Sequence, residues 1–263
     1  MKMKAILVTG ASGGIGKEFA RQFAYRGYDL LLVARRQEEL AKIKEEFIEE
    51  YKVKVEYLAC DIAKDPKAVY DHCKQNDIDV SVLINNAGYG DYTSFMNADL
   101  DKLEGMIDLN NKALVALTYY FLPEMKKQGY GHIINVGSVA SFMPGPYMAV
   151  YYATKAFVMS FSMALREELK NDGIKVSVLC PGPVRSDFWK VADADNTAMN
   201  TSRFSRSAID AAKSGYSLFE TGKAYVVDGS LNKVLVGFAR HLPLELCARL
   251  VGEVQKRVKG KAD

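Results

Sequence analysis

The chain has 263 residues, of which 49% are hydrophobic and 25% are charged, and this ordinary composition argues against disorder of the whole chain. Its formal net charge is only +3, and no long basic stripe is interleaved with aromatic residues, so nucleic-acid binding has little electrostatic support. No run approaches the roughly 20 apolar residues that cross a bilayer, and the four cysteines form neither a C-x-x-C pair nor a metal-ligand pattern, so we expect a cytoplasmic protein without a metal site.

Short apolar runs bounded by turn residues predict seven strands along the chain. They cover residues 5–8, 29–34, 53–59, 80–84, 132–136, 175–179 and 224–227. Segments of helical period separate most of these runs, and each run is almost wholly apolar, which is typical of a parallel sheet covered by helices on both faces. The predicted fold class is therefore α/β, a doubly wound Rossmann-like sheet in a single domain, with ligands bound at the carboxyl ends of the strands.

The first predicted strand ends in the glycine-rich turn TGASGGIG, which fits two motifs. Gly10, Ser12 and Gly14 satisfy G-x-S-x-G, the turn that presents the nucleophilic serine of a hydrolase. Gly10, Gly14 and Gly16 also fit the phosphate-binding turn of dinucleotide-binding proteins, with Ile15 at the start of the following helix. No earlier strand exists to supply an oxyanion loop, and no histidine completes a triad. We therefore predict a nucleotide site, in which the Ser12 hydroxyl helps to bind a 2′-phosphate or the pyrophosphate of the cofactor. A serine hydrolase that uses Ser12 is kept as an alternative.

The end of the second predicted strand indicates which nucleotide binds. NAD-specific sites usually carry an acidic residue there, which holds the ribose 2′-hydroxyl. This chain has Arg35 and Arg36 instead, and guanidinium groups pair with a 2′-phosphate. The sequence therefore favours NADP(H) over NAD(H).

Several phrases together resemble the short-chain dehydrogenase/reductase superfamily, in the order and spacing of that family. They are TGASGGIG, CDI, NNAG, INVGS, YYATK and CPGPVRSDF, and they span roughly the first 190 residues. The resemblance implies one Rossmann-like domain with a seven-stranded sheet. It also implies hydride transfer between a nicotinamide and a carbonyl or alcohol substrate.

The reactive group is predicted at Tyr151 on independent physical grounds. Tyr151 and Lys155 are four residues apart on a predicted helix, so their side chains share a face. A nearby ammonium group favours phenolate and lowers a tyrosine pKa from its usual value of about 10, which suits a general acid or base. Tyr152 lies only three residues from Lys155 and does not fit this spacing. Ser138 ends the fifth strand and can polarise the substrate oxygen, with Ser141 as the less favoured neighbour.

The resemblance assigns further roles along the chain. Asn110, with Asn111 adjacent, is implied to hold a water molecule in a proton relay through Lys155, which also anchors the nicotinamide ribose. The remaining implied cofactor positions are Asp61 and Ile62 at the adenine end, Asn86, Ala87 and Gly88 on the ribose side, and Pro181, Gly182, Val184 and Ser186 near the nicotinamide.

The substrate is predicted only as a class, an apolar carbonyl compound or alcohol. This rests on side chains expected near the pocket, namely Tyr89, Phe142, Met143, Tyr147, Phe188 and Trp189. Residues 187–207 are polar and poorly periodic, and a loop of that length in a compact domain is more often functional, so we expect a lid over the strand ends. A nucleotide-binding regulator without catalysis is a further alternative, although it would not need Asn110, Ser138, Tyr151 and Lys155 together.

Residues 1–228 are predicted to form the nucleotide-binding and catalytic domain, and residues 229–263 an amphipathic extension. Apolar residues recur at helical intervals from Leu231 to Val254, with an interruption at Pro243. Packing on the domain or on a partner subunit is one interpretation. A helix on a membrane surface is the other, because basic residues lie nearby. These are Lys256, Arg257, Lys259 and Lys261. The resemblance also implies a homodimer or homotetramer paired through the helix that carries Tyr151.

Overall fold

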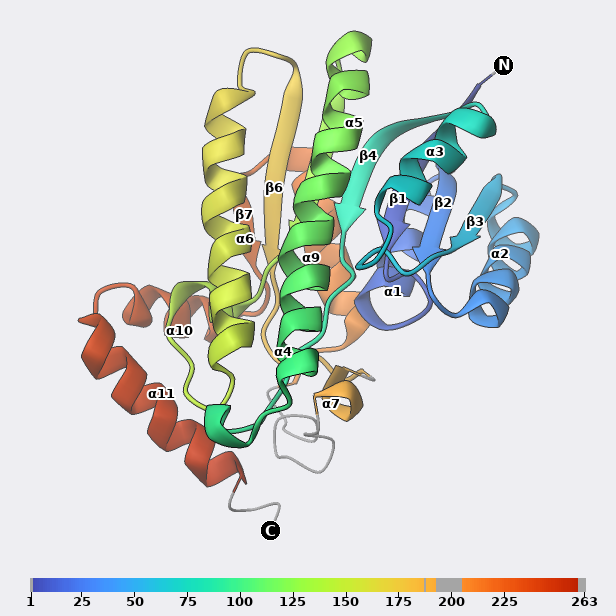
Figure 1. Ribbon diagram of the computed structural model, residues 1–263. Helices are drawn as coiled ribbons and strands as arrows, with labels where there is room; N and C mark the ends of the chain where they lie inside the picture. Colours follow the sequence, from blue (N-terminus) through green and yellow to red (C-terminus); the bar gives the residue numbers. More distant parts are fainter. Residues whose placement is uncertain (1, 187, 193–204, 260–263) are drawn as a thin grey trace.

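A computed structural model of the chain describes residues 2–186, 188–192 and 205–259. Within these residues, seven strands form one sheet in the order β3-β2-β1-β4-β5-β6-β7 (Figure 1). Every neighbouring pair is parallel. The chain therefore starts in the middle of the sheet, builds outward to β3, returns to β4 and then builds to the other edge, which is the doubly wound topology.

The strands are close to the predicted ones, because a strand buried on both faces is a continuous apolar run. They are β1 (Met3–Thr9), β2 (Asp29–Ala34), β3 (Val55–Ala59), β4 (Ile78–Asn85), β5 (Gly131–Val136), β6 (Ile174–Cys180) and β7 (Tyr225–Val227). The fold class predicted from the sequence is confirmed.

Helices connect the strands and continue beyond the last of them. The α-helices are α1 (Gly14–Ala24), α2 (Gln37–Tyr51), α3 (Lys67–Gln75), α4 (Leu100–Ile107), α5 (Leu114–Gln128), α6 (Ala149–Glu168), α7 (Phe188–Val191), α9 (Ala208–Thr221), α10 (Ser230–Ala239) and α11 (Leu244–Lys259). Three short helices complete the described part of the chain: the 3₁₀-helices η1 (Phe95–Asn97) and η3 (Val139–Phe142), and the π-helix η2 (Asp108–Ala113).

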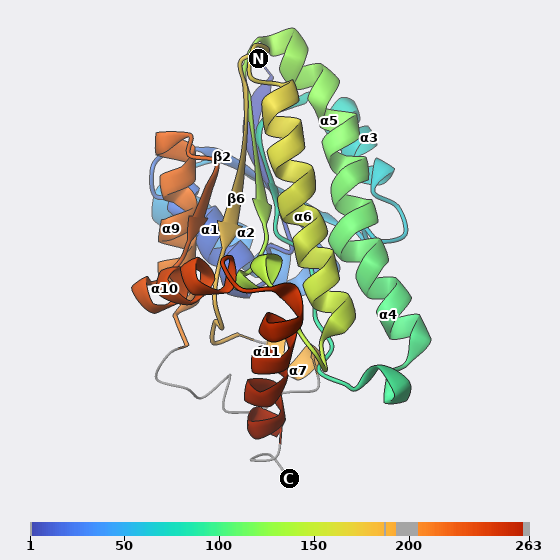
Figure 2. The ribbon, with the colours of Figure 1, turned by 90° about the vertical axis from the view of Figure 1, so that its left-hand side faces the viewer.

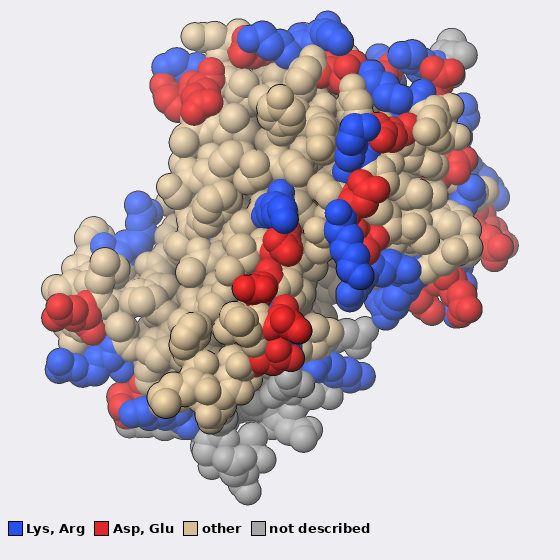
Figure 3. All heavy atoms as spheres, viewed as in Figure 1, with Lys and Arg blue, Asp and Glu red and all other residues tan. Residues whose placement is uncertain are grey.

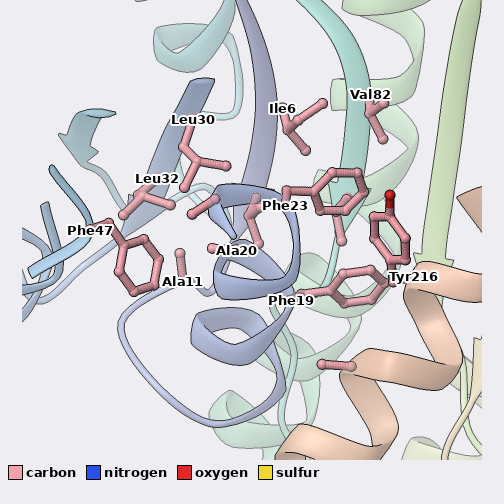
Figure 4. Close-up of a cluster of buried hydrophobic side chains, with 14 of the residues drawn as sticks. Ile6, Ala11, Phe19, Ala20, Phe23, Leu30, Leu32, Phe47, Val82 and Tyr216 are labelled. Atoms are coloured by element: carbon pink, nitrogen blue, oxygen red, sulfur yellow. The ribbon is translucent and has the colours of Figure 1, made fainter. Parts of the chain in front are cut away.

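Two groups of helices cover the two faces of the sheet, as the edge-on view in Figure 2 shows. Phe19 and Phe23 of α1, Phe47 of α2 and Tyr216 of α9 pack on one face. Figure 4 shows these rings around alternate residues of the central strands, such as Leu30. Helices α3, α5 and α6 cover the other face, against the intervening strand residues. This double cover leaves the carboxyl ends of the strands as the place for a ligand.

The C-terminal part of the chain lies beyond the strand ends, at the lower left of Figure 1. Helices α10 and α11 are separate, because Pro243 ends the apolar period of the first and Cys247 N donates to Pro243 O in the first turn of the second. Most of the lid predicted over residues 187–207 falls outside the described residues, which include only 188–192 and 205–207 of it. In the described part of the chain, no helix has the length and apolar character needed to cross a membrane.

His132, near the start of β5, is buried with its side chain only 1% exposed. Its Nε2 lies 2.9 Å from Ser177 Oγ, and that hydroxyl donates its own hydrogen to Lys223 O over 2.7 Å. The imidazole Nε2 must therefore carry a proton and donate it to Ser177. Burial, with a smaller contribution from two nearby cations, lowers the pKa of His132 to about 3.

We expect the free energy of unfolding to fall as the pH drops from about 6.5 toward 3. In this window the unfolded chain binds a proton at His132 and the folded chain does not, so stability rises with pH, and the loss near pH 3 is about 4 kcal/mol. His132→Gln keeps an N–H donor for Ser177 and should flatten the slope in urea unfolding at a series of pH values. His241→Gln, at an exposed position, is the control. Equal slopes in wild type and His132→Gln would contradict the prediction.

Candidate active site

A cleft of about 470 Å³ opens at the carboxyl ends of the strands. The residue that follows each of the strands β1 to β6 lines it, as expected where parallel strands end at one edge of a sheet. Most of the predicted cofactor residues line this cleft, namely Gly10, Ser12, Gly14, Ile15, Arg35, Arg36, Asp61, Ile62, Asn86, Ala87, Gly88, Tyr151, Lys155, Pro181, Gly182, Val184 and Ser186. Ser138 lines it as well, whereas Gly16 and Asn110 lie behind its wall.

The glycine turn at the end of β1 requires residues without side chains. Gly10 and Gly14 have φ values of +65° and +53°, in the left-handed region that glycine adopts most readily. Gly16 is needed for space, because a Cβ atom there would lie 2.3 Å from Gly10 O. The turn therefore delivers α1 end-on to the cleft, with the free backbone N–H groups of its first turn facing the space where a phosphate would bind.

Thr9 and Asn86 hold the glycine turn against the loop after β4. The Thr9 hydroxyl donates to Ile84 O over 3.2 Å and accepts from the backbone N–H groups of Asn86 and Ala87 at 3.0 and 3.1 Å. The Asn86 side chain donates in turn to Thr9 O at 2.9 Å and to Gly10 O at 3.3 Å. The amide of Asn86, expected on the ribose side of the cofactor, thus also fixes the shape of the turn, and the part that Thr9 plays was not predicted.

The end of the cleft beside β2 is cationic. Arg36 Nε donates to Ser12 Oγ over 3.2 Å, and its Nη2 donates to Ser12 O over 3.0 Å. Arg35 is exposed and lines the same end of the cleft. This contact places the Ser12 hydroxyl beside a guanidinium group, so both groups can donate hydrogen bonds to the same anion. Guanidinium groups pair well with phosphate oxygens.

Ser138, Tyr151 and Lys155 meet in the middle of the cleft. Ser138 caps η3 by accepting from Ala140 N at 3.1 Å, and its hydroxyl donates weakly to Pro181 O over 3.4 Å. Lys155 is buried and donates from Nζ to Val136 O over 2.8 Å, with Nζ 5.8 Å from the centre of the Tyr151 ring. Ser141, the neighbouring candidate, instead accepts from the backbone N–H of Ser138 and does not line the cleft.

Burial controls the protonation of this group. It raises the pKa of Tyr151 to about 12, an effect that the hydrogen-bonding Ser138 hydroxyl partly opposes. Burial also lowers the pKa of Lys155 to about 8. The expectation that the Lys155 ammonium would lower the pKa of Tyr151 is not met in this structure, because desolvation of the phenol dominates. Tyr151 is therefore a protonated acid at neutral pH, and Lys155 loses its proton more easily than an ordinary lysine.

Asn110 lies behind the cleft wall, in the π-helical turn that joins α4 to α5. Its Oδ1 accepts from Tyr89 N at 3.1 Å, and its Nδ2 donates to Tyr89 O at 3.0 Å and to Thr154 Oγ1 at 3.1 Å. Asn111 Nδ2 donates to Thr154 O at 2.9 Å. The pair thus ties the loop after β4 to α6 in the turn just before Lys155, and the water-holding role implied for Asn110 stays a prediction. Single π-turns often lie at functional sites.

The far end of the cleft is apolar. Tyr89, Phe188 and Trp189 line it as predicted, but Phe142 and Met143 pack on a buried cluster beside α10, and Tyr147 lines a separate cavity of about 30 Å³. These three were expected near the pocket, and the structure places them outside the cleft lining. Four further lining residues add apolar surface here and were not predicted from the sequence: Val139, Met148, Tyr152 and Val191.

Tyr152 is fixed by the C-terminal helix. Gln255 of α11 is only 1% exposed, and its Nε2 donates to the Tyr152 hydroxyl over 3.1 Å. The Tyr92 hydroxyl donates to Gln255 O on the same helix turn. Because these partners are more than 100 positions apart in the sequence, no local pattern could have revealed the contact.

The arrangement does not support the serine hydrolase alternative. None of the three histidines lines the cleft, and His132 is committed to Ser177. Ser12 contacts Arg36, a cation that cannot serve as a general base. Within the described residues, no group of three or more His, Cys, Asp or Glu side chains is placed to hold a metal ion.

Comparison of the sequence with known proteins agrees with this geometry. Residues 4–197 match the family model described as short chain dehydrogenase. A very-long-chain 3-oxoacyl-CoA reductase from Meyerozyma guilliermondii is 33% identical over 219 residues, which cover 79% of this chain and 64% of that protein. A protein of the same name from Rattus norvegicus is 32% identical over 238 residues, covering 87% of this chain and 74% of that one. The chain thus spans slightly less than two thirds of the length of the Meyerozyma relative.

Solved structures of dehydrogenases are also similar to this chain. A short-chain dehydrogenase from Sphingobium yanoikuyae in complex with NADPH is 31% identical, with a TM-score of 0.80 over 92% of this chain and 96% of that chain. A bulky-bulky ketone specific alcohol dehydrogenase from Comamonas testosteroni is 27% identical, with a TM-score of 0.76 over the same shares of the two chains. With the family match over residues 4–197 and the doubly wound sheet, these likenesses show that the chain belongs to the short-chain dehydrogenase family.

Proposed function

We propose that the chain is an NADP(H)-dependent ketoreductase that converts an apolar ketone to the corresponding alcohol. The observation that carries this proposal is the position of Ser138, Tyr151 and Lys155 between a cationic end and an apolar end of one cleft. The cationic end suits a nucleotide that carries a phosphate at one extremity and a hydride donor at the other. The apolar end suits a hydrophobic substrate. A regulator that only binds nucleotide would not need a buried acid and lysine at that junction.

The residues present fit NADP(H). The glycine turn and the start of α1 form a cradle for the pyrophosphate, because Gly10 and Gly14 adopt the positive φ values that the tight turn needs, and a Cβ atom at Gly10 would lie only 2.8 Å from Asn86 Nδ2. Arg36 and Ser12 form a donor pair for a 2′-phosphate. When bound, the reduced nicotinamide supplies the hydride for ketone reduction.

Each member of the central group has a distinct proposed role. The Tyr151 phenol, protonated at neutral pH, donates its proton to the oxygen that becomes negative as the ketone is reduced. The Ser138 hydroxyl contacts Pro181 O weakly and also hydrogen-bonds to Tyr151, so it lies where it can donate to the same oxygen. Lys155 uses one N–H group on Val136 O and has two left for ribose hydroxyls. Asn110 holds the turn of α6 that precedes Lys155.

The substrate class that we propose is a 3-oxoacyl thioester with a long acyl chain. Two observations support it: the apolar end of the cleft, and the shared name of the curated relatives from Meyerozyma guilliermondii and Rattus norvegicus. Since those relatives are about 32–33% identical and this chain spans only part of them, the substrate must be tested directly.

The test is NADPH oxidation by the full chain with 3-oxoacyl-CoA substrates of increasing length. We expect kcat/KM to rise by about fourfold for each added methylene until the apolar end is filled, because a buried methylene contributes about 0.8 kcal/mol. A bulky aromatic ketone that carries no thioester is the comparison substrate. Turnover of that ketone without turnover of any 3-oxoacyl-CoA would overturn the substrate class but keep the reductase. Absence of turnover with every carbonyl compound would overturn the function.

A further inference from the structure

Helices α10 and α11 present large apolar side chains to solvent. We call this surface the C-terminal apolar face, and it consists of Leu231, Val234, Leu235, Phe238, Leu244, Leu246, Leu250 and Val254. Each of these side chains is at least 39% exposed, and five of them are more than half exposed. Isolated exposed apolar residues are ordinary, but a set on two consecutive helices marks a surface that another body covers.

The exposure is not a sign of loose packing, because the opposite sides of both helices are firmly held. Val236 of α10 is 3% exposed, and Asn232 donates to Asp228 O over 2.7 Å. On α11, Cys247 is 3% exposed and Gln255 only 1%. Both helices therefore have apolar residues on two sides, one directed to the domain and one directed outward.

The charge around this face selects its partner. Residues 230–263 contain seven Lys and Arg and three Asp and Glu, so this segment carries +4 while the whole chain carries only +3. All of the positive excess of the chain thus lies in the last 34 residues, and the remainder is close to neutral. Figure 3 shows that charged groups lie mainly at the edge of the surface over α10 and α11, at its lower left. Among the described residues 230–256, the exposed cations Lys233, Arg240, Arg249 and Lys256 outnumber the exposed acids Glu245 and Glu253. An apolar surface with such a net cationic margin complements a sheet of anionic lipid headgroups.

A second copy of the chain is a poorer match for the same face. In a two-fold dimer the face would meet itself, and its cationic margins would repel one another. Membrane crossing is also unsuitable, since neither α10 nor α11 is long and apolar enough. A helix pair that lies flat in the interface satisfies both the apolar side chains and the charges.

We propose that the C-terminal apolar face binds the surface of an anionic lipid bilayer, with α10 and α11 lying in its headgroup layer. The site would sit next to the apolar end of the cleft. Gln255 on the inner side of α11 contacts Tyr152, which lines that end, and Gly252 packs close to Pro146 just before α6. Figures 1 and 2 both place α11 beyond the carboxyl ends of the strands, where the cleft opens.

Vesicle flotation of the full chain tests this proposal. Wild type should float with vesicles of phosphatidylcholine and phosphatidylserine and remain in the bottom fraction with phosphatidylcholine alone. For the double variant Leu235→Asp/Phe238→Asp, the ratio of vesicle-bound to free protein should fall at least about tenfold. The variant removes two apolar side chains from the face and adds two negative charges, which the anionic lipids repel. The matched control Tyr25→Asp/Ile209→Asp changes exposed apolar residues elsewhere and should bind as wild type does.

Two further measurements separate the sources of binding. Lys233→Glu/Lys256→Glu should weaken flotation and its salt dependence, whereas Lys42→Glu/Lys52→Glu on and just after α2 should not. Sedimentation equilibrium without lipid reports the oligomeric state, and circular dichroism confirms that each variant is folded. The proposal is overturned if wild type does not float with anionic vesicles, or if the Leu235/Phe238 variant floats equally well. It is also overturned if wild type forms an oligomer that does not bind vesicles and that the Leu235/Phe238 substitutions dissociate.

Discussion

Replacing Tyr151 with phenylalanine is expected to lower kcat for ketone reduction by about a thousandfold, the usual contribution of a general acid. The variant keeps the ring that packs on Tyr152 and Phe188 and removes only the hydroxyl. NADPH binding, measured by fluorescence titration, should change by less than about threefold, because the ring keeps its place in the cleft. A loss in kcat without a loss in cofactor affinity identifies a group that acts in the chemical step.

The matched variant is Tyr152→Phe, one position along the same helix. It removes a hydroxyl that accepts from Gln255 and does not reach Lys155 at the required spacing, so its kcat should fall by less than about tenfold. If Tyr151→Phe retained most of its activity while Tyr152→Phe lost it, the assignment of the acid would be wrong by one residue. If both variants were fully active, the tyrosine mechanism itself would be refuted.

Replacing both Arg35 and Arg36 with alanine is expected to raise KM for NADPH by about a hundredfold and leave KM for NADH almost unchanged. Each charge-assisted hydrogen bond to a phosphate contributes about 1.5–3 kcal/mol, and only NADPH carries the 2′-phosphate. Arg36 already lies on Ser12, at the end of the cleft where that phosphate would bind. The preference for NADPH over NADH should therefore fall by about the same hundredfold, measured as the ratio of kcat/KM values.

Arg26→Ala controls for the loss of positive charge, because Arg26 lies over the Tyr216 ring in the turn after α1 and does not line the cleft. It should leave both KM values unchanged. Equal losses for NADPH and NADH in the Arg35/Arg36 variant would mean that the arginines shape the turn and do not recognise the phosphate. In that case the preference for NADP(H) would be refuted.

The sequence predicted the structure best where a local physical requirement restricts which residue types can occupy a position. The central strands are buried on both faces, so their apolar runs predicted the sheet, and the glycines of the first turn are there because positive φ and close packing admit nothing larger. The Tyr151 and Lys155 pair was predicted from helical spacing together with the resemblance carried by YYATK. All of these features are local in sequence.

The features that were missed depend on the whole fold. Phe142 was expected in the pocket but packs on a buried cluster that includes Val178 of β6 and Val236 of α10, which are distant from it in the sequence. Tyr152 enters the cleft wall through a contact with Gln255, which follows it by 103 positions. The pKa of Tyr151 depends on how deeply the phenol is buried, which spacing on a helix does not report. Long-range packing decides each of these outcomes.

The Thr9 hydroxyl has a consequence for protein engineering. This single oxygen joins the glycine turn to the backbone of Asn86 and Ala87. The side-chain amide of Asn86 in turn donates a hydrogen bond to the backbone oxygen of Thr9. The two loops thus behave as one interlocked part, although Thr9 and Asn86 are 77 positions apart. If the turn alone were transplanted into a related scaffold to change the nucleotide that it accepts, it would lack the hydrogen bonds that the loop after β4 supplies. A successful graft has to carry both loops, with Thr or Ser kept at position 9.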